Sequence, residues 1–135
     1  MRLTELVRMD SRGRVIIPLT VRDAFNLRGG MYMMLIADVE DKEMKILPFA
    51  DPSAKLVEIR VTLGDVPGAL ARVAAVLARF NVDLLSTRSR TLHRGELAEW
   101  HAIADISKCK CKIEELKEKI MMEGAAKEVG INAHS

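Results

Sequence analysis

Residues 56–70 have the sequence LVEIRVTLGDVPGAL, and this stretch decides the fold of the longer part of the chain. From residue 57 to residue 63, aliphatic residues alternate with charged or polar ones, which is the pattern of a strand with one buried face. Gly64, Pro67 and Gly68 then interrupt the strand and predict a tight loop. The stretch therefore predicts a half-buried strand, a loop and the start of a helix.

The rest of the chain continues this alternation of strands and helices. We expect a helix over residues 69–80, a strand pair at 82–91 and 97–106, a second helix over 111–122 and a last strand at 126–131. The side chains expected on the buried face of the first helix are Leu70, Val73, Leu77 and Phe80, and those on the buried face of the second are Ile113, Leu116, Ile120 and Met121. The order is that of the ferredoxin-like βαββαβ fold, so the predicted fold class is α+β.

The first fifty residues carry their own turn signals. A turn at residues 11–13 separates two extended runs and predicts a short hairpin. Pro18 suits the first turn of a helix, because its missing N–H costs nothing there. The expected elements are strands at 4–9 and 15–17, a short helix that ends near Asn26, and strands at 31–39 and 44–49.

Residues 7–18, VRMDSRGRVIIP, followed by Val21, Arg22 and Leu27, resemble the signature of the AbrB family of swapped-hairpin DNA-binding proteins. The resemblance assigns residues 1–50 to such a domain and implies that two chains interleave their hairpins into one dimeric β-barrel. In that family, arginines of the hairpin and helix face the DNA. The matching candidates here are Arg8, Arg14 and Arg22, with Arg12 in the turn as a fourth.

Arginine suits DNA because its guanidinium group makes paired hydrogen bonds to phosphate oxygens or guanine edges. Residues 1–30 carry six arginines and three acidic residues, whereas residues 31–53 carry five acidic residues and two lysines. This polarised charge can orient a polyanion, so double-stranded DNA is the predicted partner. The alternative is that these arginines form a solvated polar face with local ion pairs.

From Leu56 onward the chain is similar to ACT domains, small regulatory units of amino-acid metabolism. The resemblance rests on the loop at 65–70, on residues 80–83 after the helix and on the βαββαβ order, and it assigns residues 55–131 to this domain. The turn-forming residues at 51–53 predict a linker over 51–54. It implies a small-molecule effector, with an amino acid as the first candidate, whose carboxylate binds loop amides and whose ammonium group binds Asp65. The ligand-binding candidates are Asp65, Val66, Pro67, Gly68, Ala69 and Leu70. The alternative is a loop that only starts a helix, in a domain that only dimerises.

Composition bounds the assembly and the location. Hydrophobic residues make up 49% of the chain but aromatic ones only 4%, so a first module of about fifty residues has little with which to build a core alone. We expect a homodimer, or a tetramer where ACT domains pair further. No run approaches the roughly 20 apolar residues of a membrane span, and no signal peptide is evident, so a cytoplasmic protein without membrane contact is expected.

Cys109 and Cys111 are too close for an ordinary structural disulfide, which favours a reducing compartment. The lysines around them can lower a thiol pKa, so a redox role stays open. A zinc site that joins them to His93 and His101 does not fit known ligand spacings, and neither metal nor cofactor is expected.

The sequence holds no phosphate-binding loop, dinucleotide fingerprint or nucleophile elbow, so we expect no enzyme activity. It predicts a DNA-binding transcription regulator whose ACT domain senses a small molecule. Two alternatives stay open. One is an interaction module that controls a partner enzyme of amino-acid metabolism, and the other is an antitoxin-like autoregulator.

Overall fold

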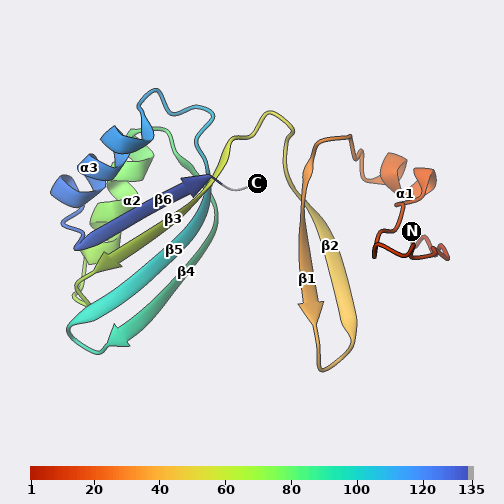
Figure 1. Cartoon of the computed structure of the whole chain (residues 1–135), viewed down its shortest axis with the longest axis horizontal. Helices are drawn as coiled ribbons and strands as arrows, with labels where there is room; N and C mark the ends of the chain where they lie inside the picture. Colours follow the sequence, from red (N-terminus) through yellow and green to blue (C-terminus); the bar gives the residue numbers. More distant parts are fainter. Residues whose placement is uncertain (134–135) are drawn as a thin grey trace. The chain divides into compact units, whose positions relative to one another are not determined.

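A computed structural model describes residues 1–133 and divides the chain into two compact units, Met1–Pro52 and the residues from Ser53 onward. The first unit contains α1 (Leu19–Ala24), β1 (Tyr32–Asp38) and β2 (Glu43–Ala50). The second contains β3 (Leu56–Leu63), α2 (Ala69–Arg79), β4 (Asp83–His93), β5 (Leu97–Asp105), α3 (Ile113–Glu123) and β6 (Glu128–Ala133). Each unit has its own sheet (Figure 1).

The four strands of the second unit form one antiparallel sheet in the order β4-β5-β3-β6 (Figure 1). The strand β3 lies inside the sheet, where Ile59 is opposite Ala102 of β5 and Ile131 of β6. Both helices, α2 and α3, cover the same face of this sheet. The predicted ferredoxin-like βαββαβ order is therefore confirmed.

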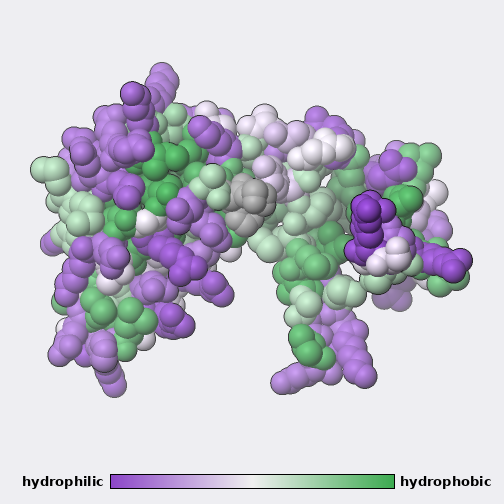
Figure 2. All heavy atoms as spheres, in the orientation of Figure 1, coloured by the Kyte–Doolittle hydropathy of each residue, from purple (hydrophilic) through white to green (hydrophobic). Residues whose placement is uncertain are grey.

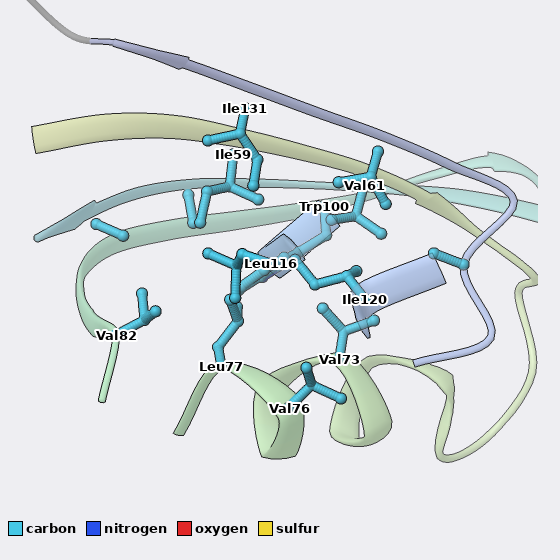
Figure 3. Packing of buried hydrophobic residues seen from close by; sticks show 14 of the residues in the cluster. Ile59, Val61, Val73, Val76, Leu77, Val82, Trp100, Leu116, Ile120 and Ile131 are labelled. Atoms are coloured by element: carbon cyan, nitrogen blue, oxygen red, sulfur yellow. The ribbon is translucent and has the colours of Figure 1, made fainter. Parts of the chain in front are cut away.

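Aliphatic side chains from both layers form the core of the second unit (Figure 3). Ile59 and Val61 of β3 extend from the sheet toward Leu77 of α2 and toward Leu116 and Ile120 of α3. All five side chains are buried. Burying one side chain of this size contributes roughly 1.5–3 kcal/mol. The second unit therefore has a hydrophobic core within a single chain.

The loop between β3 and α2 determines where the helix begins. Gly68 precedes the helix with φ +87, a left-handed conformation that a residue without Cβ adopts at little cost. Asn81, with φ +59, follows the helix and ends it. The predicted buried face is confirmed at Val73 and Leu77, but Leu70 is exposed rather than inside, because it borders a hollow at the first helical turn.

The helix α3 buries Leu116 and Ile120 as predicted. Met121 was also expected inside, and this was wrong: its side chain is 40% exposed. Met121 follows Ile120 directly and lies about 100° further round the helix, away from the core. Gly124 ends the helix, at a point where an added Cβ would lie 2.6 Å from the carbonyl oxygen of Ile120.

The first unit is built around one antiparallel strand pair. Tyr32 of β1 is opposite Ala50 of β2, and Asp38 is opposite Glu43, so both strands form where they were predicted. The helix α1 begins directly after Pro18 and ends at Ala24, slightly before its predicted end. These elements make a two-stranded sheet with one short helix.

The hairpin expected at the N-terminus is only partly present. Its turn exists, because the Gly13 amide donates to the Asp10 carbonyl at 3.1 Å and the Asp10 amide donates to the Arg14 carbonyl at 2.9 Å. The runs at 4–9 and 15–17 form no strand, which corrects the prediction of two strands there. A strand needs a hydrogen-bonded neighbour, and within residues 1–133 these runs have none. One chain alone therefore does not form the predicted barrel.

No side chain of the first unit is fully buried in a single chain. Figure 2 shows hydrophobic residues on the surface over β1 and β2. Leu6 and Ile16 are almost wholly exposed. A hollow of about 140 Å³ between α1 and the strand pair is lined by Ile17, Val21, Phe25, Leu27, Met33, Ile46 and Pro48. Apolar surface of this kind is typical of a face that is covered in an assembly.

Candidate effector site and candidate nucleic-acid interface

The β3–α2 loop borders a hollow on the helix-covered side of the second sheet. Its volume is about 190 Å³, below the roughly 300–1,000 Å³ of pockets for drug-sized ligands, so it suits a small metabolite. Its walls are formed by Leu63, Gly64, Asp65, Val66, Ala69, Leu70, Ser89, Arg90, Thr91, Ala98, Glu99 and Trp100. Four of the six predicted loop residues are among them, whereas Pro67 and Gly68 are not.

Asp65 fixes the loop to the turn between β4 and β5. Its Oδ2 accepts a hydrogen bond from the Gly95 amide at 2.7 Å, and its own amide donates to the Glu96 carbonyl at 3.3 Å. The carboxylate that was predicted to bind a ligand's ammonium group therefore already has a structural partner. Its second oxygen, Oδ1, is the atom left for such a contact.

Backbone donors lie at the start of α2. Within residues 1–133, the amides of Leu70 and Ala71 have no hydrogen-bond acceptor, as is usual for the first turn of a helix. Such N–H groups, together with the helix dipole, favour a bound anion. A carboxylate beside Leu70, which lines the hollow, would meet these donors.

The opposite wall of the hollow was not predicted from the sequence. Ser89 and Thr91 come from β4, and the rim carries Arg90 and Glu99, whose side chains form an ion pair at 3.5 Å. These residues lie far from the loop in the sequence, and β5, which lies between β3 and β4 in the sheet, brings them to it. The sequence predicted the strands, but it does not specify the register that joins them.

A family match agrees with this geometry. The family model of the ACT domain matches residues 57–120. An ACT domain is found in this chain. It begins in β3 and reaches into α3. The ACT domain indicates a regulatory role in which a small molecule is sensed.

Two solved structures are similar to part of this chain. No curated protein matches the chain. The C-terminal domain of the MgtC protein from Mycobacterium tuberculosis is similar with a TM-score of 0.49 and 15% identity, over 62% of this chain and 92% of that structure. An unknown protein from Galdieria sulphuraria gives a TM-score of 0.49 and 13% identity, over 69% of this chain and 58% of that one.

The four candidate DNA-binding arginines all lie in the first unit and are all exposed. Arg12 and Arg14 flank the glycine of the turn at residues 11–13. Among the described residues, the guanidinium groups of Arg8 and Arg12 have no ion-pair or hydrogen-bond partner. Both side chains are therefore open to an external anion.

Asp10 organises the turn that carries Arg12 and Arg14. Its Oδ1 accepts hydrogen bonds from both amides at 2.9 Å, and its Oδ2 accepts one from Arg14 Nε at 2.8 Å. The backbone and side-chain hydrogen bonds from Arg14 lower the pKa of the Asp10 carboxyl below 3.8. Arg22 Nε donates to the Ile17 carbonyl at 3.0 Å. Arg14 and Arg22 thus have local partners of the kind expected for a solvated polar face.

The two cysteines lie at the start of α3 and are free thiols. Their Sγ atoms are 2.9 Å apart. Burial, followed by the hydrogen bond with Cys109, raises the pKa of Cys111 to about 11. Nearby lysines can lower a thiol pKa, which left a redox role open, but the pKa of Cys111 moves in the opposite direction. The Cys111 thiol is therefore protonated at neutral pH.

The zinc candidates His93 and His101 lie on β4 and β5. Within residues 1–133, no three His, Cys, Asp or Glu side chains gather as a metal-binding group. None of the helices in this part of the chain is long and apolar enough to cross a membrane.

Proposed function

We propose that this chain is a DNA-binding regulator whose ACT domain holds a small carboxylate-bearing effector, with an amino acid as the first candidate. The observation that carries the proposal is the hollow of about 190 Å³ between the β3–α2 loop and β4. Amides at the start of α2 supply donors for a carboxylate, and Asp65 Oδ1 supplies an acceptor for an ammonium group. The proposal includes no catalytic step.

The first unit supports the DNA-binding half. Its apolar side chains have no core within one chain, and the runs at 4–9 and 15–17 have no strand neighbour. A second copy of the chain supplies both, as in the swapped-hairpin arrangement of AbrB-like domains. The dimer then presents each exposed arginine twice, so that one protein meets two DNA half-sites. The arginines proposed for this contact are Arg8, Arg12, Arg14 and Arg22.

The effector half is tested by calorimetry of the full-length chain with each of the twenty amino acids. Leu70→Glu places a carboxylate in the hollow, and Ala75→Glu places the same charge on an exposed position further along α2, outside the lining. Glutamate is a good helix former, so both variants should fold. We expect at least one amino acid to bind the wild type and Ala75→Glu alike, and to bind Leu70→Glu at least tenfold more weakly. Equal binding by all three proteins would exclude this site.

The DNA half is tested by binding to genomic DNA fragments over a salt series. Arg8→Ala removes a guanidinium that has no ion-pair or hydrogen-bond partner within residues 1–133, whereas Arg72→Ala removes one from the exposed face of α2. Because each neutralised phosphate releases counterions, the affinity should fall as the salt concentration rises. Arg8→Ala should reduce the slope of the logarithm of the binding constant against the logarithm of the salt concentration by about one for each phosphate that is no longer neutralised. Arg72→Ala should leave it unchanged.

The two tests also separate the alternative. Effector binding without salt-dependent DNA binding would contradict the regulator and leave the interaction module for a partner enzyme. A shift of DNA affinity on addition of the bound amino acid would join the two halves, because it requires the effector to bind the two states unequally.

A further inference from the structure

The face of the second sheet opposite its helices has a hollow of its own. It measures about 460 Å³ and is lined by Arg60, Arg88, Ser89, Arg90, Glu99 and His101. In Figure 1 this is the face of β3, β5 and β4 that α2 and α3 do not cover. The hollow is therefore separate from the one at the β3–α2 loop.

Three basic side chains lie in one row across this face. His101 of β5 is directly opposite Arg60 of β3 on one side and Arg88 of β4 on the other. Residues opposite one another in antiparallel strands point to the same face, so all three side chains project together. With strands about 4.8 Å apart, the two arginine backbones are roughly 10 Å apart across His101. Two arginine side chains can converge over that distance on one small anion.

The charges of this row are only partly compensated. His101 Nε2 is 3.7 Å from Glu58 Oε1, and Arg90 is paired with Glu99. Within residues 1–133, neither Arg60 nor Arg88 has an ion-pair partner. Arg60 and Arg88 lie on either side of His101 and are exposed, so both guanidinium groups are open to an anion from solution.

We propose that Arg60, His101 and Arg88 bind the phosphate group of a small metabolite. The planar guanidinium group matches a phosphate with paired hydrogen bonds, and two such groups suit a dianion. A volume of about 460 Å³ leaves room for more of the ligand than its phosphate.

The surroundings favour a compact anion over a nucleic acid. The carboxylates of Glu58 and Glu99 border the row and repel an extended chain of phosphates. Single-stranded nucleic acids also need aromatic side chains for stacking, and the hollow has no Phe, Tyr or Trp in its lining. This site goes beyond the proposed effector site, since the two hollows open on opposite faces of the sheet.

The test is calorimetry of the full-length chain with inorganic pyrophosphate at constant ionic strength. The variant is R60Q/R88Q, with R60K/R88K to retain charge without the paired donors and R72Q as the control for loss of an arginine elsewhere. We expect pyrophosphate to bind the wild type and R72Q within twofold of each other. We expect binding at least tenfold weaker in R60Q/R88Q, with R60K/R88K between them. Melting temperatures establish that each variant is folded.

Several outcomes would overturn the proposal. These are no binding of pyrophosphate to the folded wild type, unchanged binding in R60Q/R88Q, and an equal loss in R72Q. Malonate provides the carboxylate arm, and tighter binding of malonate than of pyrophosphate would contradict a phosphate site. A single-stranded oligonucleotide that binds through these arginines while pyrophosphate does not would make the face a nucleic-acid surface.

Discussion

Apolar strands are buried in one unit of this chain and exposed in the other. In β3, Ile59 and Val61 are wholly buried because α2 and α3 lie over them. In β1, Leu35 and Ile36 are 58% and 49% exposed, although β1 is as apolar as β3. The difference teaches that apolar residues make a core only where a second layer covers them. One six-residue helix does not cover the strand pair of the first unit.

The largest expected effect is a dependence on protein concentration that only the first unit shows. If a second copy completes that unit, dilution below the dissociation constant of the dimer should remove the exchange protection of amides in β1 and β2. Amides of β3, inside the second sheet, should keep theirs. Hydrogen exchange at two protein concentrations a hundredfold apart measures the protection of both regions in the same protein. If dilution changed the exchange protection of β1 and β3 equally, the proposed difference between the two units would be contradicted.

Truncation of the second core should be the next largest effect. Leu77→Ala removes a wholly buried side chain, and such changes cost about 2–5 kcal/mol in the free energy of unfolding. Urea unfolding followed by the fluorescence of Trp100, the only tryptophan, reports on this unit. Leu35→Ala in the first unit is the control and should leave that transition in place. A loss below about 1 kcal/mol for Leu77→Ala would contradict the core described here.

A smaller loss is expected at the end of α3. The Cβ of Gly124→Ala would lie 2.6 Å from the Ile120 carbonyl oxygen and 3.2 Å from Val73 Cγ2, so α2 and α3 must shift. Overpacking of this kind costs about 1–3 kcal/mol. Gly130→Ala in β6 meets no atom within 4 Å and should be neutral or slightly stabilising. Equal melting temperatures for the two variants would show that the helices are less closely packed.

The smallest effect concerns the turn of the first unit. The pKa of Asp10 is lowered by hydrogen bonds from Arg14, so the carboxylate form stabilises the turn. That contribution is complete well above pH 3.8 and is lost as the pH falls through the lowered pKa. An NMR titration of the Arg14 amide should have its midpoint below 3.8, and Asp10→Asn should abolish it. A midpoint at or above 3.8 would contradict the hydrogen bonds to Asp10.

Much of the second unit could be predicted because its signals are local. The alternation through Val57, Ile59 and Val61 reports one buried strand face, and Val73 with Leu77 reports one helix face. Gly68 marks the start of α2 because its left-handed conformation disfavours other residues. The βαββαβ order follows from counting such elements. Met121 was misplaced because an apolar residue next to a helical stripe looks like part of it.

The rest depends on pairings between distant residues. Nothing in the sequence tells that Arg60 and Arg88 both lie opposite His101, since a shift of one residue in either register would turn a side chain to the other face. The wall of the effector hollow from β4 was missed for the same reason. The N-terminal strands were predicted from an extended run at 4–9 and a β-branched run at 15–17, yet a strand needs a hydrogen-bonded neighbour that one chain does not supply.

Arg90, Ser89 and Glu99 border both hollows of the second unit, one on each side of the sheet. Their side chains alternate between the faces: Arg90 and Glu99, which are opposite one another, point to the face of His101, whereas Ser89, opposite Trp100, points to the face of the core. The two proposed sites are therefore divided by little more than the backbone of β4 and β5. If a ligand on one face shifted that backbone, thermodynamic linkage would require each ligand to change the other's affinity by the same factor.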